Sequence, residues 1–538
     1  MTNEDNRMHA GDVDHGPAAW DIDLAWQRTL DDERSRVFIR NPLILDVAKR
    51  RIVQKLARLK ERLTEGKYHP DPARQCDIPK PGHLVRPGAY LTIADRIVYA
   101  AAVGECLTSL HQELGWAQDG IDYSYRLNPD MRASEWFDEK ARFGAWSEFR
   151  KSNITALDSG DWSHVVMADI TGYYENIDIG LLVSDLRTSG APRMAVDTLS
   201  SCLNSWATVA GRGVPQGYGP SDVLAKFYLN VVDLQLNNQG FRHSRYVDDY
   251  LILCRNLPLA KRAIVELGRI LRQRGLNLQS AKSEILSSAQ ARSRIDGITP
   301  VLTDVSRRYV AGVVAQLQIE DPYVNLRDAE EVIAHHAADP PLAVIRKAFR
   351  THFGLSSDRS FDKTLFHFLL RRLAKQHDGF AVKRCVHFIY EHPQETGEIL
   401  DYLAAVPALE DVEPDVTNYL LSDEAVYPYQ VYQVLECYAD KLPRRAPGML
   451  RIARRFASDG GAPFYLRSVA RRYVGIHGTA PDLEELLGAF RECTDKYERC
   501  EIAFALRRLE KGRRNAFYAR WAAEGGLLKD AIELAKDV

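Results

Sequence analysis

The sequence has few cysteines, and their spacing excludes two common kinds of stabilised architecture. Eight cysteines are scattered over 538 residues without the CxxC or CxxH pairs that bind zinc. A disulfide framework is excluded as well, because such frameworks belong to short, cysteine-dense secreted chains. We expect reduced thiols that are mostly buried.

Long apolar runs are also absent. No stretch approaches the roughly 20 apolar residues that a membrane-spanning helix needs. The first residues, MTNEDNRMHAGDVDHG, are polar and acidic and lack the apolar centre of a signal peptide. We therefore predict a cytoplasmic protein with no membrane partner, whose residues 1–18 are disordered.

Neither sign of charge is in excess, because 71 lysines and arginines face 73 aspartates and glutamates, for a net charge of −2. The chain as a whole is therefore not a polycation. Any nucleic acid must be held in a locally basic groove, or through metal and backbone contacts. The length predicts two to four domains rather than a single core.

Two adjacent carboxylates stand at the centre of the stretch HSRYVDDYLILC, which begins at His243. Apolar and β-prone residues flank Asp248 and Asp249, which predicts two short strands joined by a tight turn with both carboxylates at its tip. Such a tip presents oxygen ligands to a hard cation, and Mg²⁺ prefers them. An ordinary Asp-Asp hairpin turn is the alternative for this tetrapeptide alone.

A third carboxylate lies at the end of a predicted buried strand at 164–170. Asp169 ends this strand, where a charge is costly unless it faces a cation or a donor. It is therefore the natural partner of Asp248 and Asp249. The segment GRGVPQGYGPSDVLAKFYL lies between them and predicts a glycine-rich loop that opens a helix near Ser221.

Two further patterns lie upstream of this strand. CDIPKPGHLVRPGAYLTIADRIV predicts a strand pair around 84–93 and a helix from Ala94. Residues 115–150 mix tryptophan, tyrosine and phenylalanine with arginine. These aromatics either stack on bases or form core, and core is the commoner use.

The order of these motifs resembles that of the reverse transcriptases. YVDD is similar to their motif C, ADITGYYENID to motif A, GVPQGYGPSDVLAKFYL to motif B and NLQSAKSEIL to motif D. RPGAYLTIADRIV is similar to the fingers pattern RPLxIPxxxDRxxQ of group II intron and related bacterial enzymes, with Leu91 in place of Pro and Tyr99 in place of Gln. The likeness covers about residues 80–290.

Within that superfamily the chain looks most like the abortive-infection (Abi) and unknown-group defence enzymes. One reason is the pair of segments WDIDLAWQRTLDDE and DYSYRL. The other is a tail of successive amphipathic helices without a clear thumb, maturase or HNH nuclease pattern. The resulting fold class is an α+β right-hand polymerase, fingers and palm, followed by an all-α HEAT-like helical-repeat domain. The expected domains are 19–300 and 301–538.

The resemblance implies a metal site. Asp169 and Asp248 are the expected main ligands, Asp249 is auxiliary, and the carbonyl of Ile170 is a backbone ligand. Two Mg²⁺ ions are expected, with Mn²⁺ as the alternative, because nucleotidyl transfer uses paired cations about 3.5–4 Å apart.

The resemblance also assigns residues to the nucleotide. Tyr174 falls where an aromatic ring blocks a ribose 2′ hydroxyl, so dNTPs are the expected substrates. Gln216 and Gly217 are expected beside the templating pair, and Arg86 on the triphosphate, because guanidinium binds phosphate bidentately. Lys282 is the expected proton donor to pyrophosphate, with a solvated loop lysine as the alternative.

The function implied is a DNA polymerase of antiphage defence that binds dNTPs and nucleic acid. RNA-directed, protein-primed and template-independent synthesis all stay open, as do a non-coding RNA partner and homo-oligomers. The family's primer is a tyrosine, and the sequence does not single one out among 427, 429, 432, 438, 465, 473, 497 and 518. A templated reverse transcriptase of a mobile element and a non-catalytic scaffold or sensor are the alternatives.

Overall fold

The structure is a computed structural model that describes residues 16–117, 120–296, 301, 304–305, 340–355, 361–442 and 444–538, without the side chains of 35 and 139–143. It divides into two compact units. The first comprises residues 16–40, 51–75 and 87–295, and the second comprises 41–50, 76–86 and the described residues from 296 onward. The domain limits predicted at 18/19 and 300/301 stay predictions, and residues 1–15 of the predicted disordered segment lie outside the described part.

The first unit consists of helices around a small sheet. Its helices are α1 (Ile22–Ser35), α3 (Ile52–Thr64), α4 (Ile93–Leu114), α5 (Glu139–Asp158), α6 (Tyr173–Asn176), α7 (Ile179–Thr188), α8 (Arg193–Trp206), α9 (Gly219–Asn238), α10 (Leu257–Gln273) and α11 (Ser288–Asp296). Within the described ranges, no helix combines the length and apolarity needed to cross a membrane.

A strand pair is present upstream of α4, but only its second strand falls within the predicted range 84–93. Strand β1 (Arg74–Lys80) pairs with β2 (Leu84–Tyr90). The chain leaves the strand before residue 93 because Thr92 caps α4, accepting a hydrogen bond from the Asp95 amide at 3.2 Å. The predicted helix start near Ala94 is confirmed.

The central sheet has four antiparallel strands in the order β4 (Arg242–Tyr246), β5 (Asp249–Cys254), β3 (His164–Ala168) and β6 (Glu284–Ser287). The predicted hairpin is confirmed as β4 and β5. Strand β3 ends two residues earlier than predicted, because from Asp169 its backbone pairs with the loop before β6: the Gln279 amide donates to the Asp169 carbonyl at 2.7 Å.

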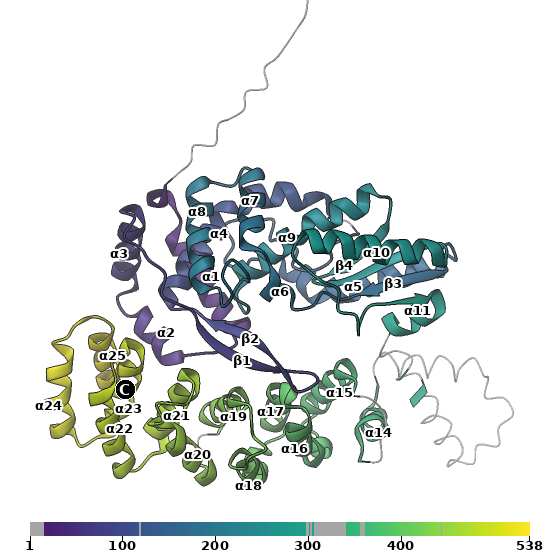
Figure 1. Cartoon of the computed structure of the whole chain (residues 1–538). Coiled ribbons are helices and arrows are strands. Elements are labelled where there is room, and N and C mark those ends of the chain that lie inside the picture. The colour runs from purple at the N-terminus through teal and green to yellow at the C-terminus, as the bar shows by residue number, and fades with distance from the viewer. Residues whose placement is uncertain are drawn as a thin grey trace, which may run out of the picture. The chain divides into compact units, whose positions relative to one another are not determined.

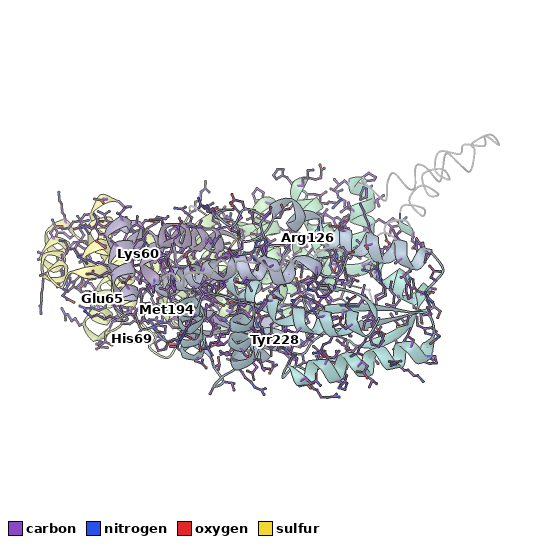
Figure 2. All side chains as sticks on the ribbon, turned by 90° about the horizontal axis from the view of Figure 1, so that it is seen from above. Lys60, Glu65, His69, Arg126, Met194 and Tyr228 are labelled. Atoms are coloured by element: carbon purple, nitrogen blue, oxygen red, sulfur yellow. The ribbon has the colours of Figure 1, made fainter. Side chains whose placement is uncertain are left out.

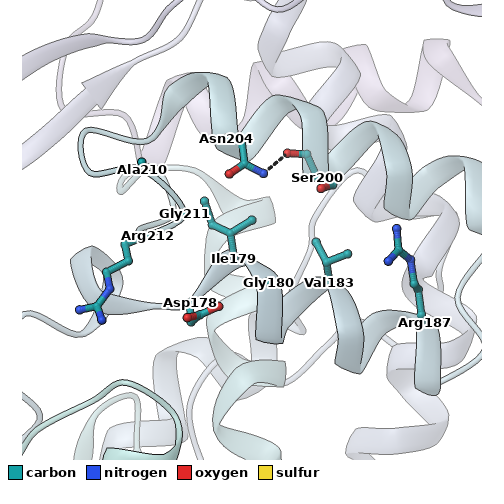
Figure 3. A pocket seen from close by; sticks show the side chains of 10 residues that line it. All are labelled: Asp178, Ile179, Gly180, Val183, Arg187, Ser200, Asn204, Ala210, Gly211 and Arg212. Carbon is teal, nitrogen blue, oxygen red and sulfur yellow. Dashed lines mark hydrogen bonds between the residues drawn. The ribbon is translucent and has the colours of Figure 1, made fainter.

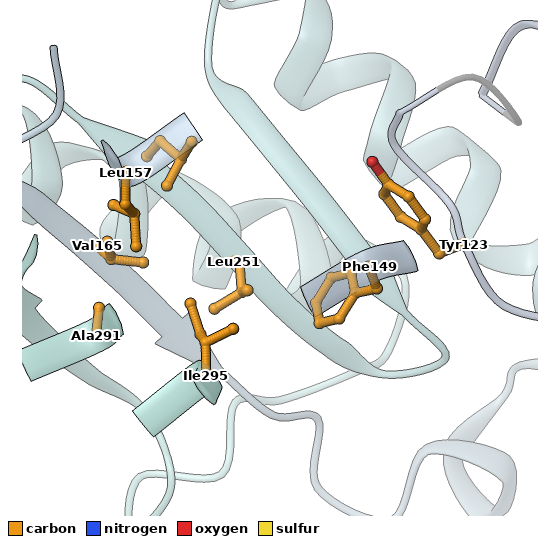
Figure 4. Packing of buried hydrophobic residues seen from close by; sticks show 8 residues of the cluster. Tyr123, Phe149, Leu157, Val165, Leu251, Ala291 and Ile295 are labelled. Atoms are coloured by element: carbon orange, nitrogen blue, oxygen red, sulfur yellow. The ribbon is translucent and has the colours of Figure 1, made fainter. Parts of the chain in front are cut away.

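One face of this sheet packs against α5 and α11. Val165 lies directly opposite Leu253 in the β3–β5 register, so both side chains point to the same face. They form a buried cluster with Phe149 from α5 and Ile295 from α11 (Figure 4). The other face is covered by α10, which lies along the strands in Figure 1, so the sheet is buried on both sides.

The second unit is helical throughout its longer segments. Its helices are α2 (Pro42–Lys49), α14 (Leu342–Phe353), α15 (Lys363–Lys375), α16 (Val382–Glu391), α17 (Thr396–Ala405), α18 (Leu409–Leu420), α19 (Pro428–Lys441), α20 (Pro447–Ala457), α21 (Phe464–His477), α22 (Ala480–Glu492), α23 (Lys496–Ala505), α24 (Lys511–Ala522) and α25 (Gly526–Asp537). The first of the successive amphipathic segments of the tail, VSRRYVAGVVAQL at 305–317, lies outside the described residues apart from Val305.

These helices pack on neighbours two positions along the chain. Helix α15 contacts α17, α17 contacts α19, α19 contacts α21, and α21 contacts α23, while α16, α18 and α20 form a second series (Figure 1). Helix α2, far earlier in the sequence, packs on α23 and α25. The Asn41 amide, just before α2, donates to the Glu501 carboxylate at 2.7 Å.

Candidate active site

The turn between β4 and β5 carries the two adjacent carboxylates. Asp248 lies in the turn and Asp249 begins β5. The last β3–β5 pair is Ala168 with Tyr250, so the next positions place Asp169 opposite Asp249. Directly opposed residues of antiparallel strands have Cβ atoms about 4.5–5.5 Å apart. The sheet register thus brings the predicted carboxylates to the same end of adjacent strands.

The carboxylates perturb one another's ionisation. Burial, followed by the charge of Asp169, raises the pKa of Asp248 to about 6. Loss of hydrating water, followed by the charges of Asp248 and Asp169, raises the pKa of Asp249 to about 7, although part of that residue is exposed. A bound cation would reduce the electrostatic repulsion between such neighbouring carboxylates.

The donor set fits a hard cation in chemistry, since its atoms are carboxylate oxygens. Within the part of the chain that the structure describes, however, no three His, Cys, Asp or Glu side chains are grouped closely enough to hold a metal ion as they stand. The geometry therefore shows neighbouring carboxylates and no formed metal centre.

The loop before β6 lies next to Asp169. The Lys282 Nζ lies 3.3 Å from the Asp169 carboxylate, and 65% of the lysine side chain is exposed against 15% of the aspartate side chain. The Asp169 carbonyl faces this loop, where it accepts from Gln279. Ile170, the next residue, forms an isolated bridge with Leu278 of this loop, and its expected role as a backbone ligand stays a prediction.

The Tyr174 ring is held from helix α9. Its hydroxyl donates to the Asp222 carboxylate at 2.7 Å, and Arg36 donates to the same carboxylate at 2.6 Å. Burial raises the pKa of Tyr174 well above its ordinary value, so the phenol stays protonated and donates. The hydroxyl of neighbouring Tyr173 donates instead to the Ala225 carbonyl, inside the core.

Gly217 has a backbone that suits only glycine. Its φ is +95°, and a Cβ built there meets the Phe38 ring at 3.1 Å and the Arg36 carbonyl at 3.4 Å. The segment at 36–38 therefore lies against the glycine-rich loop. Gln216, beside it, is partly exposed.

A buried ionic cluster behind the turn was not predicted. Arg245 donates to Asp122 and Asp233, both at 2.7 Å, and Lys226 donates to Asp122 at 2.5 Å. The sequence held one signal for it: α9 is apolar almost all round yet carries Lys226 and Asp233 seven residues apart, on one face. Charges there must be paired inside the protein.

The turn itself is strained. Val247 has φ +57°, a left-handed conformation that a β-branched residue adopts only when its surroundings impose it. Such a backbone costs about 1–3 kcal/mol, and strain of this kind concentrates at functional sites.

Comparison with known proteins agrees with this geometry. The family described as reverse transcriptase (RNA-dependent DNA polymerase) matches residues 78–313, a range that contains the three aspartates and Lys282. Residues 78–313 therefore match a reverse transcriptase domain. The match leaves the helices from α14 onward outside the domain.

Two individual proteins are similar to parts of the chain. Protein YkfC of Escherichia coli (strain K12) is 26% identical over 213 residues, which cover 37% of this chain and 48% of YkfC, so the chain spans about half of that relative. A structure of telomerase from Candida albicans, in complex with a fragment of telomeric RNA, aligns at 12% identity with a TM-score of 0.30, covering 74% of this chain and 66% of that one.

One predicted residue lies in the other compact unit. Arg86 is exposed on β2 and lies at the tip of the β1–β2 hairpin, in the segment 76–86 that belongs to the second unit rather than to the unit of the aspartates. Its expected contact with a triphosphate stays a prediction.

The aromatic and basic stretch of the reverse transcriptase domain is mostly core. Tyr123, Trp136, Phe137 and Phe149 are buried. Arg126, labelled in Figure 2, pairs with the Glu148 carboxylate at 3.0 Å. Of the two predicted uses of these aromatics, base stacking and core packing, these four rings serve core packing.

A hollow of about 490 Å³ opens elsewhere on the domain, at the start of α7. Figure 3 shows Asp178, Asn204 and Arg212 around it, with the Asn204 amide donating to the Ser200 carbonyl at 2.8 Å. Neither the three aspartates nor Lys282 line this hollow.

Proposed function

We propose that the chain is a magnesium-dependent DNA polymerase of the reverse transcriptase kind that acts in antiphage defence. The observation that carries the polymerase part is the convergence of Asp169, Asp248 and Asp249 at one end of β3 and β5, inside the matched domain. The mutual rise of the two pKa values at Asp248 and Asp249 supports a site built for cations.

In this proposal Asp169 and Asp248 hold the metal, Asp249 assists, and the Ile170 carbonyl adds a backbone oxygen. When bound, two Mg²⁺ ions activate the attacking hydroxyl and neutralise the triphosphate. Mn²⁺ is the alternative cation. The reaction joins a hydroxyl oxygen to the α-phosphorus of a dNTP and releases pyrophosphate.

The remaining residues of the site position the nucleotide or protonate the departing pyrophosphate. Lys282 is exposed beside Asp169, from where it can donate a proton to the departing pyrophosphate. Tyr174 excludes the ribose 2′ hydroxyl, and its hydrogen bond to Asp222 keeps the ring in place. Gln216 and Gly217 contact the nucleotide, and Arg86 contacts its phosphates.

The primer in this proposal is a tyrosine of the chain itself. Six of the eight tyrosines considered are buried, at positions 429, 432, 438, 465, 473 and 518. Tyr427 and Tyr497 are partly exposed, so they are the candidates that a nucleotide can reach without unfolding. The Tyr427 hydroxyl donates to the His83 carbonyl at 2.9 Å.

We further propose that the part of the chain from 301 to 538 is a HEAT-like repeat domain. The series of contacts between helices two positions apart supports this, because stacked helix pairs produce such a series. This domain would recognise a phage-derived or host partner in the cytoplasm, or assemble copies of the chain.

The test is to incubate the purified chain with Mg²⁺ and each radiolabelled dNTP, without primer, and to run denaturing gels with and without protease. Label that migrates with the protein, shifts after protease and is lost in Tyr427→Phe or Tyr497→Phe supports self-priming. Label only with an added RNA template and primer would indicate a templated reverse transcriptase. No label in either case, with protection from phage intact, would favour a scaffold.

A further inference from the structure

Arg245 connects the buried ionic cluster to the strained turn. Its Nη2 donates to Asp122 and Asp233, while its Nη1 donates to the Val247 carbonyl at 2.8 Å. The side chain is 1% exposed. One guanidinium therefore spans two buried carboxylates and the backbone of the residue that precedes Asp248.

The preceding peptide group, on the amide side of Val247, is held by Ser124. The Val247 amide donates to the Ser124 hydroxyl at 2.9 Å, and that hydroxyl donates to Asp122 at 2.9 Å. Val247 is thus fixed through both its amide and its carbonyl, by two side chains that share the Asp122 carboxylate.

The cluster is balanced in charge and closed to water. Two carboxylates face Arg245 and Lys226, and all four side chains are buried. Burial acts to raise the pKa of Asp233, but the charges and hydrogen bonds of Arg245 and His243 together outweigh it, and the pKa falls to about 2. A fully paired buried network of this kind is rigid.

We propose that Arg245 and Ser124 are positioning residues that hold Val247 in its left-handed conformation and so aim Asp248 and Asp249 at the cation. The inference rests on the proposed function. A β-branched residue at φ +57° relaxes toward extended backbone unless it is held. That relaxation would rotate the next peptide and move both carboxylates, and sites of this kind tolerate shifts of only about 0.5 Å.

Ser124→Ala is the cleanest test, because it removes one hydroxyl and leaves every charge in place. The control is Ser109→Ala, which removes another buried serine hydroxyl from the first unit, on α4. The third variant is Ser124→Ala combined with Val247→Gly. Glycine adopts a left-handed backbone without strain, so it should restore the turn that the alanine variant loses.

The measurement is the dissociation constant for Mn²⁺, followed through the paramagnetic resonance signal of the free ion, together with the Mg²⁺ dependence of dNTP incorporation. We expect Ser124→Ala to weaken Mn²⁺ binding about 10-fold, the loss that one hydrogen bond supplies. Ser109→Ala should bind as the wild type does. The double variant should recover most of the loss.

Three results would overturn the proposal: wild-type Mn²⁺ affinity in Ser124→Ala, an equal loss in Ser109→Ala, or no recovery in the double variant. Arg245→Lys, which keeps the charge but lacks the forked donors, should follow Ser124→Ala with a larger loss if it folds. Failure of the proposed function is distinguishable, because it would appear as Mn²⁺ binding without dNTP incorporation in the wild type.

Discussion

Replacing Asp248 by asparagine should stabilise the protein in a pH-dependent way. The pKa of this carboxyl is about 6 in the folded chain against 3.8 ordinarily. The folded state therefore binds its proton more tightly than the unfolded state does, and stability falls as the pH rises from about 4 through 6. Asp248→Asn keeps the side-chain shape and removes this loss.

The magnitude follows from the shift. About two pH units at about 1.36 kcal/mol each gives an upper value of about 3 kcal/mol above pH 7. Because Asp248 is partly hydrated, we expect about 1–3 kcal/mol, which raises the melting temperature of the reverse transcriptase domain by roughly 2–10 °C. Well below pH 4 the Asp248 carboxyl is protonated in both the folded and the unfolded state, so the stability difference should vanish.

The assay is thermal unfolding in EDTA from pH 4 to 8, with Asp161→Asn as the control for an exposed carboxylate in the same unit. Addition of Mg²⁺ should then stabilise the wild type more than Asp248→Asn, because the cation replaces the missing proton. A stability difference that stays constant across this pH range would refute the reasoning, since ionisation would not be its source.

Three further outcomes are expected. Gly217→Ala should destabilise the domain by about 1–3 kcal/mol and lower dNTP incorporation, because the added Cβ meets the Phe38 ring at 3.1 Å. The control is Gly190→Ala, where φ is +79° and the space around the Cβ is open, so that it tests the backbone conformation alone. Thermal unfolding and dNTP incorporation are measured for both variants. Tyr174→Ala should raise rNTP incorporation relative to dNTP at least about 10-fold in competition assays, and an unchanged ratio would remove the ring from sugar selection. Lys282→Met should lower the single-turnover rate by about 10²-fold with little change in dNTP affinity; a loss confined to affinity would contradict its role as proton donor.

The local parts of the fold could be predicted from the sequence. The β4–β5 hairpin, the start of α4 and most helices of the second unit follow from periodicity, capping residues and turn residues, which act over a few positions. Strand β3 ended early because Asp169 pairs with the loop at 277–279, a contact made across the chain. No local pattern encodes such a pairing.

The candidate site also has residues that could be predicted from the sequence and residues that could not. The three aspartates are visible in the sequence because each stands where a charge is costly. The cluster of Asp122, Lys226 and Arg245 is not, because its members come from an irregular segment, a helix and a strand that meet only after folding. For Arg86 the match to the fingers pattern is likewise visible in the sequence, and its contact with a triphosphate stays a prediction because it lies in the second unit.

The most direct test of the central claim is single-turnover incorporation of a dNTP by the wild type and by Asp248→Asn, with Mg²⁺ present and folding verified by thermal unfolding. The account predicts incorporation by the wild type, and a loss of at least about 10³-fold in a variant that is as stable as the wild type or more so. Equal incorporation by a folded Asp248→Asn would contradict it, because the carboxylates would then not carry the chemistry.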